Sequence, residues 1–96
     1  MIERTLLIKA RLGLHARAAA KLVRVASSYQ SHVLLRRADG RVTADAKSIL
    51  SVLMLAASNG TELQASVEGT DEEAAMNAID QLFAAGFGEV APESSL

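Results

Sequence analysis

Residues 61–68 alternate between apolar and polar side chains more strictly than any other part of this chain of 96 residues. The apolar set is Leu63, Ala65 and Val67, and the polar set is Glu62, Gln64, Ser66 and Glu68. Successive side chains of a β-strand point to opposite faces, so this pattern predicts a strand with one face in a core and the other in water. Residues 2–8 have the same two-residue period. Such strands indicate an antiparallel sheet that is covered on one side only.

Two further strands and two helices are predicted between these segments. Residues 16–29 are rich in alanine and place an apolar stripe at helical spacing, formed by Ala18, Leu22, Val25 and Tyr29. Residues 32–37 and 41–44 flank an Asp39-Gly40 turn and predict a hairpin. A short helix follows over residues 49–57, with Asp45 or Ser48 as its N-cap and an end near residues 58–60.

A third helix closes the predicted domain. Thr70 and Glu73 have the spacing of a capping box, and the helix should end near Gly86. Its core stripe is Ala75, Ile79, Leu82 and Phe83. The order β-α-β-β-α-β-α predicts an α+β fold, with a four-stranded antiparallel sheet and three helices on one face. Residues 1–89 form the single predicted domain, and residues 90–96 a flexible C-terminal tail.

Composition excludes several classes of function. The chain has no cysteine, which rules out disulfides and thiol catalysis, and it offers no convincing metal-ligand cluster or cofactor site. A net charge of -1 and only three aromatic residues argue against a nucleic-acid-binding module. The longest apolar run, residues 52–57, is far shorter than the roughly 20 residues of a membrane span. We therefore expect a cytoplasmic protein without membrane insertion.

His15 is the strongest candidate for chemistry. It follows the glycine-containing segment Leu12-Gly13-Leu14 at the predicted N-cap of the first helix. The first backbone N–H groups of a helix have no intrahelical partner, and with the positive dipole end they can bind an anion. The amides of Ala16, Arg17 and Ala18 could thus hold a phosphate on a neutral His15 ring, with the Arg17 guanidinium beside it. The alternative from spacing alone is that His15 only caps the helix and Arg17 is a solvated charge.

Two motifs in this chain resemble those of a known family. Leu12-Gly13-Leu14-His15-Ala16-Arg17 resembles the active-site signature of HPr, the histidine-containing phosphocarrier of the bacterial phosphotransferase system, and Lys47-Ser48-Ile49-Leu50 resembles its second signature. The likeness covers residues 2 to about 88 and implies an open-faced β-sandwich. Two departures stand out: Ala18 occupies a position where the family usually has proline, and a few extra residues lie near the predicted hairpin.

The resemblance implies a stoichiometric carrier rather than an enzyme. His15 would accept a phosphoryl group on Nδ1 from enzyme I, which takes it from phosphoenolpyruvate, and pass it to a histidine of an enzyme IIA protein, with Arg17 assisting. Ser48 would match a serine that HPr kinase/phosphorylase modifies in some bacteria. Family members dock their partners with the first two helices, which implies a docking surface of Ala20, Lys21, Arg24, Ile49, Leu50 and Leu53.

Each of these surface and site residues has a simpler interpretation. Ser48 could be only an N-cap, and Arg17, Lys21 and Arg24 could form a solvated face. Ile49, Val52, Leu53 and Ala56 form one apolar stripe of the second helix, whereas Leu50 and Met54 point elsewhere, and the extra apolar side could be covered by a loop or exposed for docking.

Two other functions are open at this stage. One is a regulatory interaction module of the same fold, in a nitrogen-type or transporter-less phosphotransferase branch, controlled through Ser48 or His15; Ala18 is the residue that motivates it. The other is a histidine phosphatase, which would require His32 to approach His15. Otherwise His32 is a surface residue of the second strand.

Overall fold

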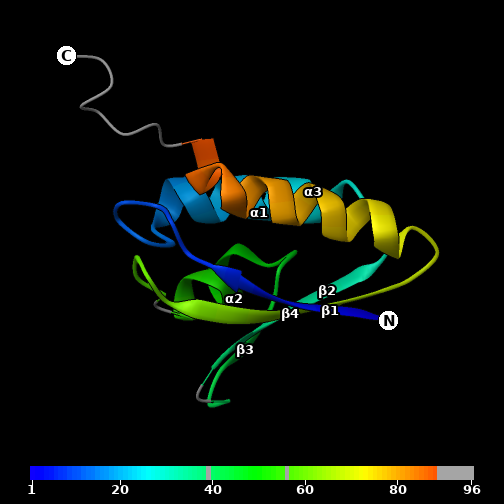
Figure 1. Ribbon diagram of the computed structural model, residues 1–96, viewed down its shortest axis with the longest axis horizontal. Helices are drawn as coiled ribbons and strands as arrows, with labels where there is room; N and C mark the ends of the chain where they lie inside the picture. Colours follow the sequence, from blue (N-terminus) through cyan, green and yellow to red (C-terminus); the bar gives the residue numbers. More distant parts are fainter. Residues whose placement is uncertain (39, 56, 89–96) are drawn as a thin grey trace.

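The computed structural model describes residues 1–38, 40–55 and 57–88 (Figure 1). The elements are β1 (Ile2–Leu7), α1 (Ala16–Ser27), β2 (His32–Arg37), β3 (Thr43–Asp45), α2 (Ile49–Met54), β4 (Glu62–Glu68), α3 (Glu72–Ala84) and a 3-10 turn, η1 (Gly86–Gly88). The predicted element order and fold class are confirmed. The predicted tail at 90–96 lies outside the described residues.

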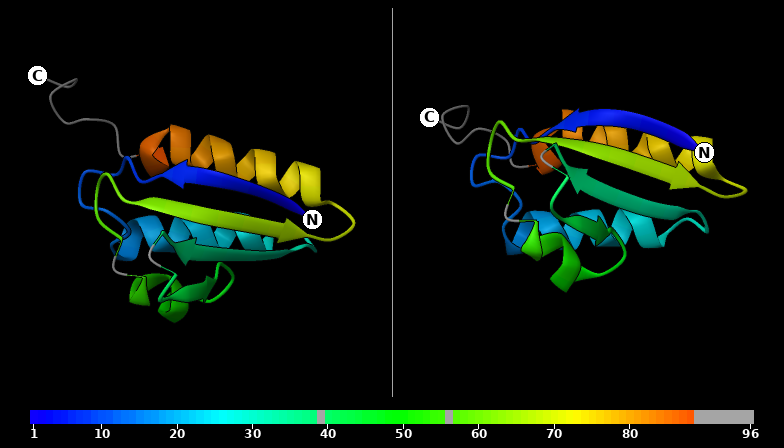
Figure 2. Two further views of the ribbon diagram at one scale, coloured as in Figure 1. Left: turned by 60° about the horizontal axis from the view of Figure 1, so that its bottom comes forward. Right: turned by 90° about the horizontal axis from the view of Figure 1, so that it is seen from below.

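The four strands form one antiparallel sheet in the order β1-β4-β2-β3. β4 is central, and its apolar side chains Leu63, Ala65 and Val67 are all buried while Glu62 and Glu68 are exposed. Figure 2 shows the open face of the sheet in front, with α1 and α3 behind it on the covered face. The two-residue period of the sequence therefore corresponds to one buried and one solvated face, as predicted.

The core between sheet and helices is aliphatic. Ala18, Ala19, Leu22 and Ala26 of α1 are buried, and small alanine side chains bring this helix close to the sheet. Phe83 and Phe87 supply the aromatic volume, with ring centroids 4.8 Å apart. The predicted core residues Val25, Tyr29 and Leu82 are only partly buried, whereas Met76 and Phe87 are buried and were not predicted.

Tertiary contacts shorten two of the predicted helices. α1 ends at Ser27 rather than Tyr29, because the chain turns toward β2 and the Tyr29 carbonyl accepts a hydrogen bond from Lys47 Nζ at 2.8 Å. α2 ends at Met54 rather than residue 57, since Leu55 is fully buried and its carbonyl is bound by Arg37. The third strand is also displaced, to Thr43–Asp45, and Ser48 rather than Asp45 is the N-cap of α2.

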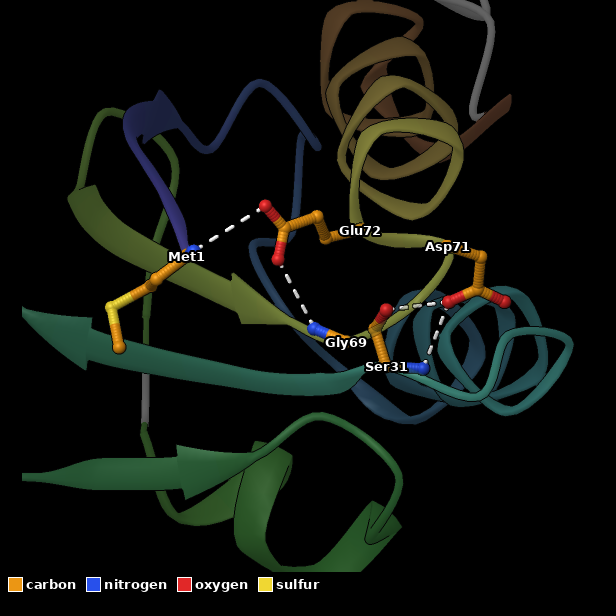
Figure 3. Close-up of polar contacts among 5 residues, drawn as sticks. All are labelled: Met1, Ser31, Gly69, Asp71 and Glu72. Carbon is orange, nitrogen blue, oxygen red and sulfur yellow. Dashed lines mark hydrogen bonds and ion pairs between the residues drawn. The ribbon is translucent and has the colours of Figure 1, made fainter.

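The predicted capping box at the start of α3 is wrong. The N-cap is Asp71, whose carboxylate turns away from its own helix and accepts hydrogen bonds from the hydroxyl and the amide of Ser31 (Figure 3). The same carboxylate also accepts a hydrogen bond from the Gln30 amide. Glu72 accepts from the Gly69 amide and pairs with the N-terminal ammonium of Met1. These carboxylates tie the start of α3 to β1 and to the turn before β2.

The hydrogen bonds to Asp71 lower the pKa of its carboxyl, chiefly the one donated by the buried hydroxyl of Ser31. A carboxyl whose pKa is depressed by folding stabilises the fold above its unfolded pKa of about 3.9. That contribution is lost as the pH falls through the lower, folded pKa. Asp71 therefore stabilises the protein at neutral pH and not in acid.

We predict that Asp71→Asn lowers the free energy of unfolding at pH 7 and that its deficit relative to the wild type shrinks below about pH 4. Urea unfolding measured over this pH range tests the prediction. Glu73→Gln removes an exposed carboxylate from the same turn and serves as the control. A deficit for Asp71→Asn that stays constant into acid would show that the charge of Asp71 is not what stabilises this junction.

Candidate functional site

His15 is the N-cap of α1, as predicted. Its backbone is extended, with φ -76° and ψ -178°, and its carbonyl accepts the first helical hydrogen bond from Ala19. The ring is half-buried, and its Nδ1 accepts a hydrogen bond of 3.3 Å from the backbone N–H of Arg17. A nitrogen that accepts such a bond carries a lone pair and no proton, so a neutral ring has its proton on Nε2. The histidine thus turns Nδ1 toward the amides that begin the helix.

The amides around Nδ1 differ in their access to solvent. Ala16 and Arg17 are exposed, and both lie in the first turn, where no earlier helical carbonyl can pair with their N–H groups. Ala18 is fully buried. Ala16 and Arg17 are therefore the accessible members of the three amides that were predicted to hold a phosphate.

The loop before His15 packs against the segment that follows α2. Gly13 has φ 71°, and the Leu14 amide donates a hydrogen bond of 2.8 Å to the Ala57 carbonyl. A Cβ at Gly13 would lie 2.4 Å from that carbonyl oxygen and 2.8 Å from Ser58 Cα. Gly13 is therefore required both for its backbone conformation and for the close approach of the two loops. The sequence indicated the conformation, but no pattern in it identified the Ala57 carbonyl as a partner.

Gly13→Ala is expected to lower the free energy of unfolding by about 1–3 kcal/mol and to displace His15, because it adds backbone strain and a collision with Ala57. Chemical denaturation and the amide chemical shifts of residues 14–17 measure the two effects. Gly40→Ala is the matched control, since Gly40 has φ 74° and open space where the Cβ would be placed. Equal losses for the two variants would mean that only backbone strain matters at Gly13.

The apolar surface of α2 is exposed. Val52 is its buried residue, whereas Leu50 and Met54 are 68% and 67% exposed and Ile49 and Leu53 are partly exposed. Within the predicted apolar stripe, Val52 is thus buried and Ile49 and Leu53 are partly exposed, while Ala56 lies outside the described residues. Leu12, in the loop before His15, is also exposed. Figures 1 and 2 place α2 and the start of α1 at the same end of the molecule.

The basic side chains of α1 do not form one solvated face. Arg17 and Arg24 are exposed, but Lys21 is half-buried and donates from Nζ to the Phe87 carbonyl at 2.8 Å. Lys21 thus holds η1 against α1 and is a weaker candidate for partner docking than the sequence indicated. Ala20 is half-buried beside it.

Ser48 and His32 have clear structural positions. Ser48 Oγ accepts a long hydrogen bond of 3.4 Å from the Ser51 amide, and Ser48 immediately precedes the apolar surface of α2. His32 is exposed at the start of β2. Because His15 and His32 flank the 12 residues of α1, about 18 Å of helix separates them, which excludes the phosphatase hypothesis.

In the part of the chain that the structure describes, no group of three or more His, Asp or Glu side chains could hold a metal ion. None of the helices found there is long and apolar enough to cross a membrane.

The fold and site define a class: an open-faced β-sandwich that presents a histidine over the first amides of a helix. A family model described as "PTS HPr component phosphorylation site" matches residues 2–85. The chain is 45% identical over 89 residues to phosphocarrier protein HPr of Xylella fastidiosa, covering 93% of this chain and 98% of that one. It is 43% identical to phosphocarrier protein NPr of Proteus mirabilis, covering 90% and 94%.

Comparison with solved structures gives the same family. A crystal structure of HPr from Thermoanaerobacter tengcongensis superposes with a TM-score of 0.88 at 38% identity, covering 95% of this chain and all of that one. The chain therefore belongs to the HPr family, and it is a phosphocarrier of the HPr/NPr type.

Proposed function

We propose that His15 accepts the phosphoryl group on Nδ1 from phosphorylated enzyme I and passes it to a histidine of an enzyme IIA protein. The observation that supports this role is the 3.3 Å hydrogen bond from the Arg17 amide to Nδ1, which leaves the lone pair on this nitrogen. In the transfer, the bond between phosphorus and the donor nitrogen breaks as the bond to Nδ1 forms. The Arg17 amide then donates to a phosphoryl oxygen instead of to the ring.

Three groups would stabilise the bound phosphoryl group. The exposed amides of Ala16 and Arg17 supply N–H donors at the positive end of α1, and the exposed Arg17 guanidinium supplies a fixed charge that matches phosphate oxygens. These groups stabilise the negative charge of the phosphoryl group electrostatically and form no covalent bond to it. The protein would act as a cytoplasmic carrier without a cofactor, and its partners would complete each transition state.

Partner docking is assigned to the apolar side chains of α2 together with Leu12. Exposed leucine and methionine side chains near a reactive group are unusual on a surface that makes no contacts. The exposed charges of Arg17 and Arg24 would favour acidic partners and make association dependent on salt. Ile49, Leu50 and Leu53 are the proposed centre of this surface.

Phosphorylation of Ser48 would provide regulation in this arrangement. A phosphate there places about -1.5 to -2 charges at the N-terminus of α2, next to the apolar docking residues. The helix dipole tolerates the charge, whereas an acidic partner is repelled. We propose an HPr kinase/phosphorylase as the enzyme that would modify Ser48. The alternative function is a purely regulatory module that is controlled through Ser48 or His15.

Incubation with phosphoenolpyruvate and enzyme I should add one acid-labile, base-stable phosphoryl group, and His15→Ala should abolish this labelling. Intact-mass measurement detects the group directly. His32→Ala removes the other histidine, which is exposed at the far end of α1, and should be labelled like the wild type. Labelling of His15→Ala would refute the proposed acceptor.

Leu50→Ser should raise the KM for enzyme I by roughly tenfold while changing the maximal rate little, because truncating a central interface side chain weakens binding by on the order of 1–2 kcal/mol. Steady-state phosphotransfer measures both parameters. Leu34→Ser is the control, since Leu34 is a partly exposed leucine on the open face of the sheet. Equal KM values for the two variants would argue against docking through α2.

A further inference from the structure

Arg37 is at the end of β2, in the row of side chains that faces the helices. Its Nη1 donates a hydrogen bond of 2.8 Å to the carbonyl of Leu55, the residue that ends α2. The last carbonyls of a helix have no intrahelical donor, and Leu55 is fully buried. The guanidinium therefore pairs a carbonyl that water cannot reach, and it places a positive charge at the negative end of α2.

Leu55, which Arg37 holds, lies close in sequence to a residue that contacts the loop before His15. Two residues after Leu55, the buried Ala57 accepts the hydrogen bond of the Leu14 amide at 2.8 Å. Gly13 lies against the same carbonyl, and Leu14 precedes His15. The position of Leu55 thus affects both the end of the apolar helix α2 and the backbone before His15.

We infer that Arg37 is a positioning residue for phosphoryl transfer, which acts by fixing Leu55 and, two residues further along the chain, Ala57, whose carbonyl holds the Leu14–His15 backbone. This inference rests on the proposed function of His15. Loss of the guanidinium leaves the buried Leu55 carbonyl without its donor, so Leu55 must shift until its carbonyl meets water. Movement of Ala57 then loosens the hydrogen bond that holds Leu14, and Nδ1 loses its fixed direction over the Arg17 amide.

The test compares two neighbouring arginines of the same strand. Arg37→Gln removes the guanidinium that donates to Leu55 and leaves a shorter, neutral amide side chain, whereas Arg36→Gln makes the same change in a side chain exposed on the open face of the sheet. Single-turnover transfer from saturating phosphorylated enzyme I should slow about tenfold in Arg37→Gln and change less than about twofold in Arg36→Gln. Arg37→Lys retains the charge and a donor and should recover part of the rate.

Hydrogen exchange supplies a measurement that does not depend on transfer. Exchange of the Leu14 amide, relative to buried amides of β4, should accelerate in Arg37→Gln and not in Arg36→Gln. If Arg37→Gln does not fold, Arg37→Lys takes its place and should change both rates in the same direction by a smaller factor. Identical Leu14 exchange and transfer rates in the wild type and the Arg37 variant would overturn the inference. If the wild type accepts no phosphoryl group, the proposed function fails, and Leu14 exchange still decides whether Arg37 fixes the loop.

Discussion

A sheet that can bury only one face determines where the helices of this protein lie. One row of side chains on each of β1, β2 and β4 faces water, so α1 and α3 must share the opposite face. Two helices packed side by side on a four-stranded sheet leave their ends at its margins. The start of α1 therefore lies at the periphery of the molecule, where its first amides can meet a ligand or a partner. The accessibility of His15 follows from this arrangement of layers.

At the margin of the sheet where α1 begins, segments that are distant in the sequence lie in contact. The loop before α1 approaches the segment after α2 so closely that only a hydrogen fits on Gly13 Cα, and the Ala57 carbonyl pairs with Leu14. A backbone held in this way fixes the position from which the His15 ring meets the Arg17 amide. His15 and the exposed apolar residues of α2 thus belong to one backbone framework, which is suited to a carrier that must be recognised by partners before it exchanges a group with them.

The sequence predicted the features that local chemistry determines. The period of residues 61–68 defined both faces of β4, and the position of His15 ahead of an alanine-rich helix identified its N-cap. Features set by distant contacts were not predicted. The capping box of α3 failed because Asp71 is bound by Ser31 in another part of the chain, and the end of α2 depends on Arg37. The sequence placed Lys21 on the surface, because no sequence pattern shows that the backbone carbonyl of Phe87 accepts a hydrogen bond from it.

The alanine at position 18, where the family usually has proline, affects the packing of the first helical turn. Proline at this first-turn position would remove an amide N–H and fix the backbone, whereas alanine retains the donor. Since Ala18 is fully buried against the core, the retained amide does not face the solvent around Nδ1. The amides of Ala16 and Arg17, which are the donors of the proposed phosphate site, precede this residue in the chain and are the same with either side chain. The exchange therefore acts on the rigidity and packing of the first turn, and it leaves the two amide donors of the proposed site unchanged.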